Sequence, residues 1–147
     1  MSNLIKLHRV ICATPEAIYR AYLEPAAMVK WLPPHGYVAK VHYHDAQVGG
    51  TYRMSFIELA TGLENTFGGK YLELVPNQRI RSTDVFDDPN LSGEMEVLVE
   101  LKAVSVGTEI TITQTGIPDE IPVEDCYVGW QQSIHLLELL LSTEKGG

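Results

Sequence analysis

Hydrophobic and polar residues alternate through most of the middle of the chain, which is typical of β-strands that bury one face. The alternation is clearest at residues 94–103, where Met95, Val97, Val99 and Leu101 are separated by polar positions. The same pattern, with turn residues between the segments, predicts further strands. They lie at residues 4–12, 37–44, 51–58, 66–74, 78–86 and 108–115.

Two short helices are predicted between the first two strands. Thr14 can cap a helix, Pro15 suits its first position, and Glu16 favours the positive end of the helix dipole. Pro25 begins a second helix, which ends before Pro33.

A long helix is predicted over residues 119–142, because apolar residues recur there at spacings of three and four. Such a stripe has to be buried, and the concave face of the sheet is the available surface. The sequence therefore predicts an α+β fold in which a curved antiparallel sheet of about seven strands wraps around a long C-terminal helix. The stripe consists of Val123, Tyr127, Trp130, Ile134, Leu137 and Leu141.

The phase of two strands decides which side chains face inward. In residues 37–44, the apolar set includes Tyr37 and Tyr43, so His42 and His44 are predicted on the outer face. In residues 78–86 either phase contains apolar residues, and the sequence leaves both registers open.

Charge and composition exclude some functions. The 147 residues suit one domain over 1–147, and the net charge of −8 has no basic cluster, which argues against binding nucleic acid. We see no secretory signal and no stretch long enough to span a bilayer, so we expect a cytoplasmic protein. Cys12 and Cys126 form no CxxC or metal pattern, and no cofactor is indicated.

No catalytic motif is recognised. His42 and His44 could share one metal ion, since alternate strand residues share a face, but their predicted outward phase argues against a metal site. His135 lies beside the helix stripe, and neither cysteine forms a nucleophile–base pattern with a histidine.

A set of aromatic residues and one methionine is a candidate for the wall of a cavity. Core packing explains such residues in most proteins, but ligand pockets also combine apolar walls with a few polar groups. Gln114 and, in one register, Asp84 would add those polar groups, and an inward Asp84 would be the best general-base candidate. The other predicted cavity residues are Trp31, Tyr43, Tyr52, Met54, Phe56, Phe67, Tyr71, Tyr127 and Trp130.

Several local segments occur in an order that resembles one superfamily. They are residues 14–21, Trp31, residues 49–53, 69–76 and 107–111, and Gly129-Trp130. This set resembles the helix-grip (START-like, SRPBCC) superfamily, and more narrowly the C-terminal domain of the activator of the heat-shock protein 90 ATPase. The resemblance implies a cavity between sheet and helix without fixing a function. Other superfamily members bind lipids or hormones, or act as polyketide cyclases.

Three hypotheses follow. The leading one is a module that binds a small apolar or amphipathic molecule under the C-terminal helix. The second is a cyclase- or hydrolase-like enzyme that uses a cavity carboxylate, which an ionisable group at the base of a cavity would favour. The third is a domain that contacts the chaperone, which a filled core with a large exposed apolar patch would favour. The sequence decides neither the identity of the ligand nor whether the protein forms a homodimer.

Overall fold

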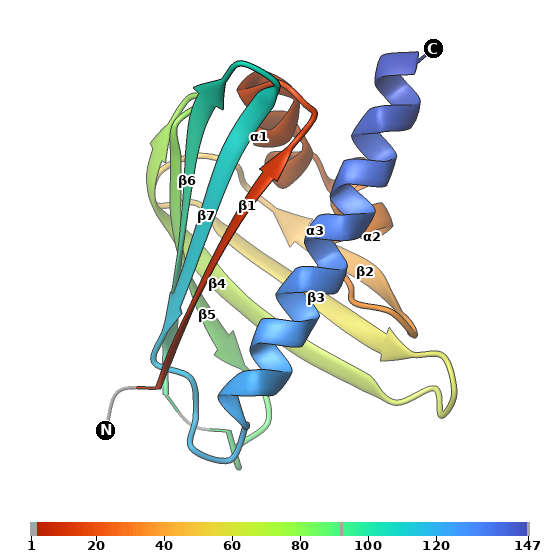
Figure 1. Ribbon diagram of the computed structural model, residues 1–147. Coiled ribbons are helices and arrows are strands. Elements are labelled where there is room, and N and C mark those ends of the chain that lie inside the picture. Colours follow the sequence, from red (N-terminus) through yellow and green to blue (C-terminus); the bar gives the residue numbers. More distant parts are fainter. Residues whose placement is uncertain (1–2, 92, 147) are drawn as a thin grey trace.

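Seven strands form one antiparallel sheet in the computed structural model, which describes residues 3–91 and 93–146 (Figure 1). The strand order is β1-β7-β6-β5-β4-β3-β2, so every neighbouring pair except β1 and β7 is consecutive in sequence. This is the helix-grip α+β fold that the sequence predicted. The strands are β1 (Leu4–Ile11), β2 (Tyr37–His44), β3 (Thr51–Glu58), β4 (Glu64–Val75), β5 (Arg79–Phe86), β6 (Met95–Val104) and β7 (Gly107–Thr115).

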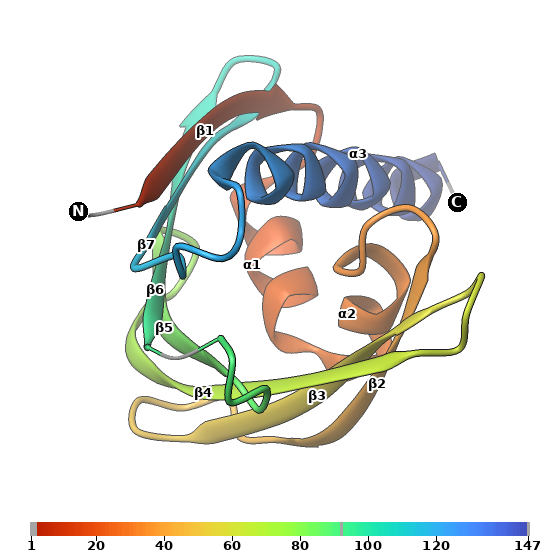
Figure 2. The same cartoon turned by 90° about the horizontal axis from the view of Figure 1, so that it is seen from below.

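Three helices fill and close the curve of the sheet. Figure 2 shows the sheet bending from β1 to β2 around α1 (Pro15–Leu23) and α2 (Pro25–Trp31). The long helix α3 (Val123–Gly146) packs against the edge strand β1 and against α2, and so bridges the two sides of the curve. No helix within the described ranges is long and apolar enough to cross a membrane.

The first helix begins where the sequence predicted. Thr14 is its N-cap: the side-chain oxygen accepts a hydrogen bond from the backbone N–H of Ala17 at 3.1 Å. Pro15 follows, with Glu16 in the first turn, and the buried side of the helix presents Ile18 and Tyr22 to the sheet. Capping therefore fixes the start of α1, and burial of its apolar face holds it inside the sheet.

The long helix is buried along its second half. Ile134 and Leu137 are fully buried and Leu141 is 4% exposed, which agrees with the predicted stripe. The helix begins at Val123, because residues 118–122 form a turn before it. Its N-terminal half is only partly covered, because an open space lies beneath it.

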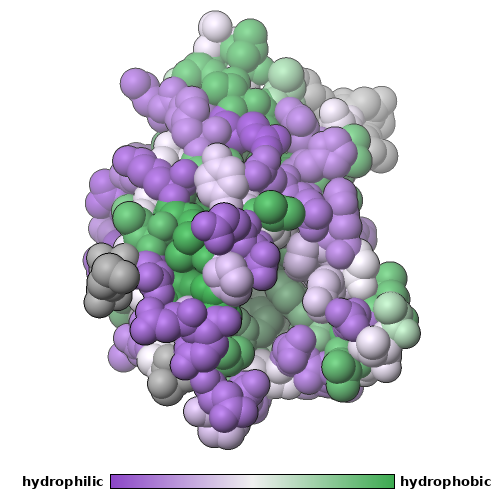
Figure 3. Space-filling model, turned by 60° about the horizontal axis from the view of Figure 1, so that its bottom comes forward, coloured by the Kyte–Doolittle hydropathy of each residue, from purple (hydrophilic) through white to green (hydrophobic). Residues whose placement is uncertain are grey.

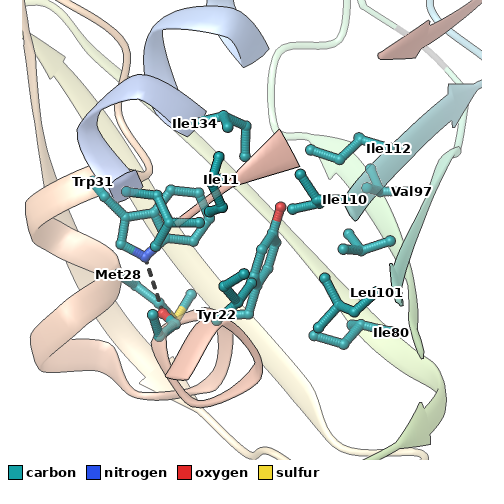
Figure 4. Packing of buried hydrophobic residues seen from close by; sticks show 14 of the residues in the cluster. Ile11, Tyr22, Met28, Trp31, Ile80, Val97, Leu101, Ile110, Ile112 and Ile134 are labelled. Atoms are coloured by element: carbon teal, nitrogen blue, oxygen red, sulfur yellow. Dashed lines mark hydrogen bonds between the residues drawn. The ribbon is translucent and has the colours of Figure 1, made fainter. Parts of the chain in front are cut away.

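The helical end of the enclosed space is tightly packed (Figure 4). Trp31 is fully buried, and its indole N–H donates to the backbone carbonyl of Ala21 at 3.0 Å. Its ring meets that of Tyr22 edge-on, with centroids 4.7 Å apart. Ile18 and Ile134, both fully buried, belong to the same hydrophobic cluster. We call these five residues the packed end.

Candidate ligand-binding cavity

A cavity of about 1,020 Å³ lies between the inner face of the sheet, α1, α2 and the N-terminal half of α3. Its mouth is formed by the β5–β6 loop, the start of β4 and the first turns of α3. Figure 3 shows hydrophobic side chains gathered in a hollow below a more hydrophilic rim. A smaller depression of about 370 Å³ near Arg79 and Thr111 lies elsewhere and shares no residue with this cavity.

The structure places most of the predicted residues on the cavity wall. Among the predicted residues, the apolar ones on the wall come from β3, β4 and α3, and the polar ones come from β3, β4, β5 and β7. The predicted residues that line it are Tyr52, Met54, Phe56, Phe67, Tyr71, Asp84, Gln114 and Trp130.

Tyr43 does not line the cavity, and the reason is an irregularity in β2. Val41 pairs with Met54 but Tyr43 pairs with Arg53, so one residue is added to β2 between them. A bulge of this kind reverses the alternation beyond it. Tyr43 is consequently 52% exposed, and His44 takes the inner phase opposite Tyr52. The prediction of an inward Tyr43 and an outward His44 was wrong.

Trp31 and Tyr127 are also corrected. Trp31 belongs to the packed end, where neighbouring side chains cover it completely. Tyr127 is 39% exposed, because the face of α3 that turns inward here carries Cys126 and Trp130 instead. Neither residue is part of the wall.

The open register of residues 78–86 is decided by the wall. Ile80, Ser82, Asp84 and Phe86 line the cavity, while Val85 is 41% exposed on the other face. Asp84 therefore lies on the cavity wall, as one of the two registers left open by the sequence predicted.

Asp84 on β5 is hydrogen-bonded to Tyr52 on β3. The Tyr52 hydroxyl contacts Oδ1 of Asp84 and also the carbonyl oxygen of Thr83, at 2.6 Å for the latter. One hydroxyl proton serves only one of these acceptors at a time. If Asp84 is protonated, its O–H can donate to Tyr52 while Tyr52 donates to Thr83. If Asp84 is ionised, Tyr52 donates to the carboxylate and the carbonyl loses this bond.

The protonation of Asp84 is balanced near neutral pH. Burial raises the pKa of Asp84 to about 7, and the hydrogen bond from Tyr52 opposes that rise. Burial, followed by the adjacent Asp84, raises the pKa of Tyr52 well above its ordinary value, so this phenol stays protonated. The pair therefore holds one proton that is easily lost and one that is not.

His44 and Tyr71 extend this polar group. The Tyr71 hydroxyl lies 2.7 Å from Nε2 of His44, and the rings of Tyr52 and Tyr71 are tilted at 5.5 Å. Burial lowers the pKa of His44, with Asp45 opposing, so the neutral imidazole can accept the proton of Tyr71. Nothing in the sequence signals the bulge that brings His44 here.

A second polar pair on the cavity wall joins β7 to α3. The indole N–H of Trp130 donates to Oε1 of Gln114 at 3.0 Å. The amide N–H of Gln114 points to the sulfur of Met95 at 3.3 Å. Gln114 thus has the inward phase that the alternation of β7 predicted, and it holds Trp130 against the sheet.

No group of three or more His, Cys, Asp or Glu side chains in the described part of the chain is arranged to hold a metal ion. Nε2 of His42 lies 2.8 Å from the hydroxyl of Ser55, whereas His44 contacts Tyr71 on the inner face. The two imidazoles therefore have different surroundings.

The sequence profile of the family described as "Activator of Hsp90 ATPase homolog 1-like protein" (AHSA1) matches residues 12–142. The chain belongs to the AHSA1 family. No curated protein is similar enough to the chain to count as a match.

Solved structures with the AHSA1 fold are similar over nearly the whole chain. A crystal structure of a protein from Chromobacterium violaceum is 55% identical, with a TM-score of 0.93 over 95% of this chain and 96% of that one. The AHSA1 protein from Silicibacter pomeroyi is 19% identical, with a TM-score of 0.81 over 96% of this chain and 99% of that one. At 19% identity, the similarity to the Silicibacter pomeroyi protein shows only that the two chains share a fold.

Several wall residues of this AHSA1 protein could not be predicted from the hydrophobic pattern, because they are small or lie in loops. Ser82 and Gly129 carry too little apolar surface to stand out in a hydrophobic pattern. Asp87 and Asp88 lie in the loop after β5, where no periodicity exists to place them. Tyr22 lies on the buried face of α1 and could have been found from its helical spacing to Ile18.

Proposed function

We propose that the cavity binds a small apolar or amphipathic molecule. The observation that supports this is the size and chemistry of the cavity: about 1,020 Å³, with aromatic and aliphatic walls and few polar groups. Ligand pockets typically have volumes of roughly 300–1,000 Å³ and this kind of lining. Protein interiors are otherwise close-packed, with few voids larger than a water molecule. A space of this size is therefore better explained by a ligand than by imperfect packing.

Gly129 offers a way to test this without weakening the fold. It lies on α3 at the cavity wall, and apart from its chain neighbours and the nearby backbone of α3, a Cβ added there would meet no atom within 4 Å. A leucine would occupy part of the cavity, and replacing a helical glycine also favours the helix by roughly 1 kcal/mol. Loss of binding without loss of stability would then separate the cavity from the core.

The experiment measures binding of the uncharged dye Nile red by fluorescence, in the wild type and in Gly129→Leu. We expect saturable binding to the wild type and at least about tenfold weaker binding to Gly129→Leu, which is the effect of about 1.4 kcal/mol. Gln131→Leu is the matched control, because Gln131 lies on the same helix but not on the wall. Equal dye binding by all three proteins would contradict the proposal.

An enzyme of hydrolase or cyclase type is the second candidate, and Asp84 is the observation that favours it. A carboxyl with a pKa of about 7 suits a general acid or base, since such groups work best near the ambient pH. Tyr52 would hold the carboxyl in place through its hydroxyl.

The hydrolase hypothesis is tested with p-nitrophenyl butyrate, an apolar ester. It predicts turnover above the buffer rate that falls by roughly 10²-fold in Asp84→Asn. Glu100→Gln, on the neighbouring strand and off the cavity wall, should leave turnover unchanged. A wild-type rate equal to that of buffer would count against this candidate.

A contact with the chaperone rests on the name of the family. The criterion for that function was a filled core with a large exposed apolar patch, and an open cavity does not meet it. We therefore rank this function behind the other two.

A further inference from the structure

The charged residues of the cavity wall all have the same sign. Its carboxylates are Glu64, Asp84, Asp87, Asp88 and Asp125, and no lysine or arginine lines the cavity in the ranges that the structure describes. Asp87 is compensated by Arg53, which pairs with it from outside the wall. Glu64 lies 3.9 Å from the imidazole of His42. Asp84, Asp88 and Asp125 have no basic partner among the described residues, so the cavity and its mouth are negative. An acidic opening attracts cations and repels anions.

One oxygen of Asp84 remains open to a ligand. Oδ1 accepts a hydrogen bond from Tyr52, and Oδ2 has no partner among the described residues. Asp84 is only half-buried, and the surface that it keeps lies on the cavity wall. An ammonium group has three N–H donors and no acceptor, so it matches a free carboxylate oxygen in a cavity without competing cations.

A second polar atom on this wall also lacks a partner. Tyr22 lines the cavity and is 8% exposed, and its buried hydroxyl makes no hydrogen bond with any described residue. Figure 4 shows its ring reaching from α1 toward the sheet. Buried polar groups in native proteins nearly always have a partner. The Tyr22 hydroxyl is covered by its neighbours, so the polar atom on this wall that a ligand can reach is the open oxygen of Asp84.

We propose that the ligand is an apolar molecule that carries an ammonium group. In this proposal, which rests on the proposed binding function, the ammonium lies on Asp84 and the apolar part lies along Met54, Phe67 and Trp130. A fatty acid or another anionic amphiphile is disfavoured, because its carboxylate would have to approach Asp84 and none of the described wall residues is Lys or Arg.

The test compares three compounds that share one apolar body: 4-phenylbutylamine, 4-phenylbutanol and 4-phenylbutanoate. Each displaces Nile red from the full chain at about pH 8, where the amine is charged and Asp84 is largely ionised. We expect the amine to bind about tenfold more tightly than the alcohol, because hydrogen bonds between charged groups are roughly twice as strong as neutral ones. The acid should bind more weakly than the alcohol.

Asp84→Asn should reduce the advantage of the amine over the alcohol to less than about threefold while leaving the alcohol's affinity in place. Glu100→Gln removes a carboxylate from the same sheet but off the wall, and should keep the full advantage. If dye and alcohol bind but the amine has no advantage, or the acid binds most tightly, this inference is overturned and the proposed binding function stands. If neither the dye nor any of the three compounds binds, the proposed function itself fails.

Discussion

The two ends of the space enclosed by the sheet and helices each contain one tryptophan, and the two tryptophans differ in burial and in the acceptor of their N–H. At the packed end, Trp31 is fully buried and its N–H donates to a backbone carbonyl. At the cavity, Trp130 is half-buried and its N–H donates to the side chain of Gln114. A backbone acceptor is fixed by the helix, whereas a side-chain acceptor can turn to another partner. The packed end is therefore built for stability, and the open end keeps polar groups that a ligand can use.

The polar side chains on the inner face follow the same division. Tyr52 with Asp84, Tyr71 with His44 and Trp130 with Gln114 are side-chain pairs that lie at or beside the cavity. At the packed end, the hydroxyl of Tyr22 has no hydrogen-bond partner in the part of the chain that the structure describes. Tyr22 lies at the border between the two ends.

The largest effect should come from the packed end. Trp31→Ala removes a fully buried indole, and we expect a loss of about 3–5 kcal/mol in the free energy of unfolding. Trp130→Ala should lose roughly half as much, because its ring is partly exposed and borders a cavity. Urea unfolding of both variants measures the difference. Equal losses would contradict the division into a packed and an open end.

Asp84→Asn should raise stability at alkaline pH. Burial raises the pKa of Asp84 to about 7, so the folded state holds this proton more tightly than the unfolded chain, whose Asp has a pKa near 3.9. Unfolding then releases the proton, and the contribution of Asp84 is complete below about pH 4 and is lost as the pH rises through 7.

We therefore expect wild type and Asp84→Asn to be nearly equal at about pH 4, and Asp84→Asn to be more stable by on the order of 2 kcal/mol at about pH 8. Urea unfolding across this range checks it. A difference that does not change with pH would show that Asp84 does not titrate in this window.

Tyr22→Phe should be neutral or stabilising. It removes a buried hydroxyl that has no partner among the described side chains and keeps the ring against Trp31. Relief of the desolvation penalty is worth about 1 kcal/mol. Thermal unfolding measures the effect, and a loss of more than about 1 kcal/mol would show that the hydroxyl is well satisfied in the native protein.

The smallest expected effect is that of zinc. His42 lies beside Ser55, and His44 lies on the inner face beside Tyr71, so one ion cannot bind both without displacing these contacts. One equivalent of zinc should leave the melting temperature unchanged. A rise that is lost in His42→Ala would contradict this placement.

The sequence predicted the elements well because each rests on local signals. Alternation marks the strands, and Thr14 and Pro15 mark the start of α1. Burial of Ile134 and Leu137 likewise follows from the spacing of apolar residues on α3.

The site was predicted less completely because it depends on features without a local signal. No glycine or proline marks the bulge between Val41 and Tyr43, yet it exchanges the faces of Tyr43 and His44. In β5 both phases contain apolar residues, so only pairing in three dimensions places Asp84 inside. Whether a buried aromatic such as Trp31 lies in a core or on a cavity wall depends on how much volume remains after packing, which periodicity does not report.

The most direct test of a binding cavity compares isoleucine side chains at the two ends by methyl NMR during titration with 4-phenylbutylamine. Ile80 and Ile121 line the cavity, whereas Ile18 and Ile134 belong to the packed end. The account predicts saturable shifts of the first two signals, little change in the other two, and loss of the shifts in Gly129→Leu. Unchanged signals from Ile80 and Ile121 at saturating ligand, or equal shifts in Gly129→Leu, would contradict it.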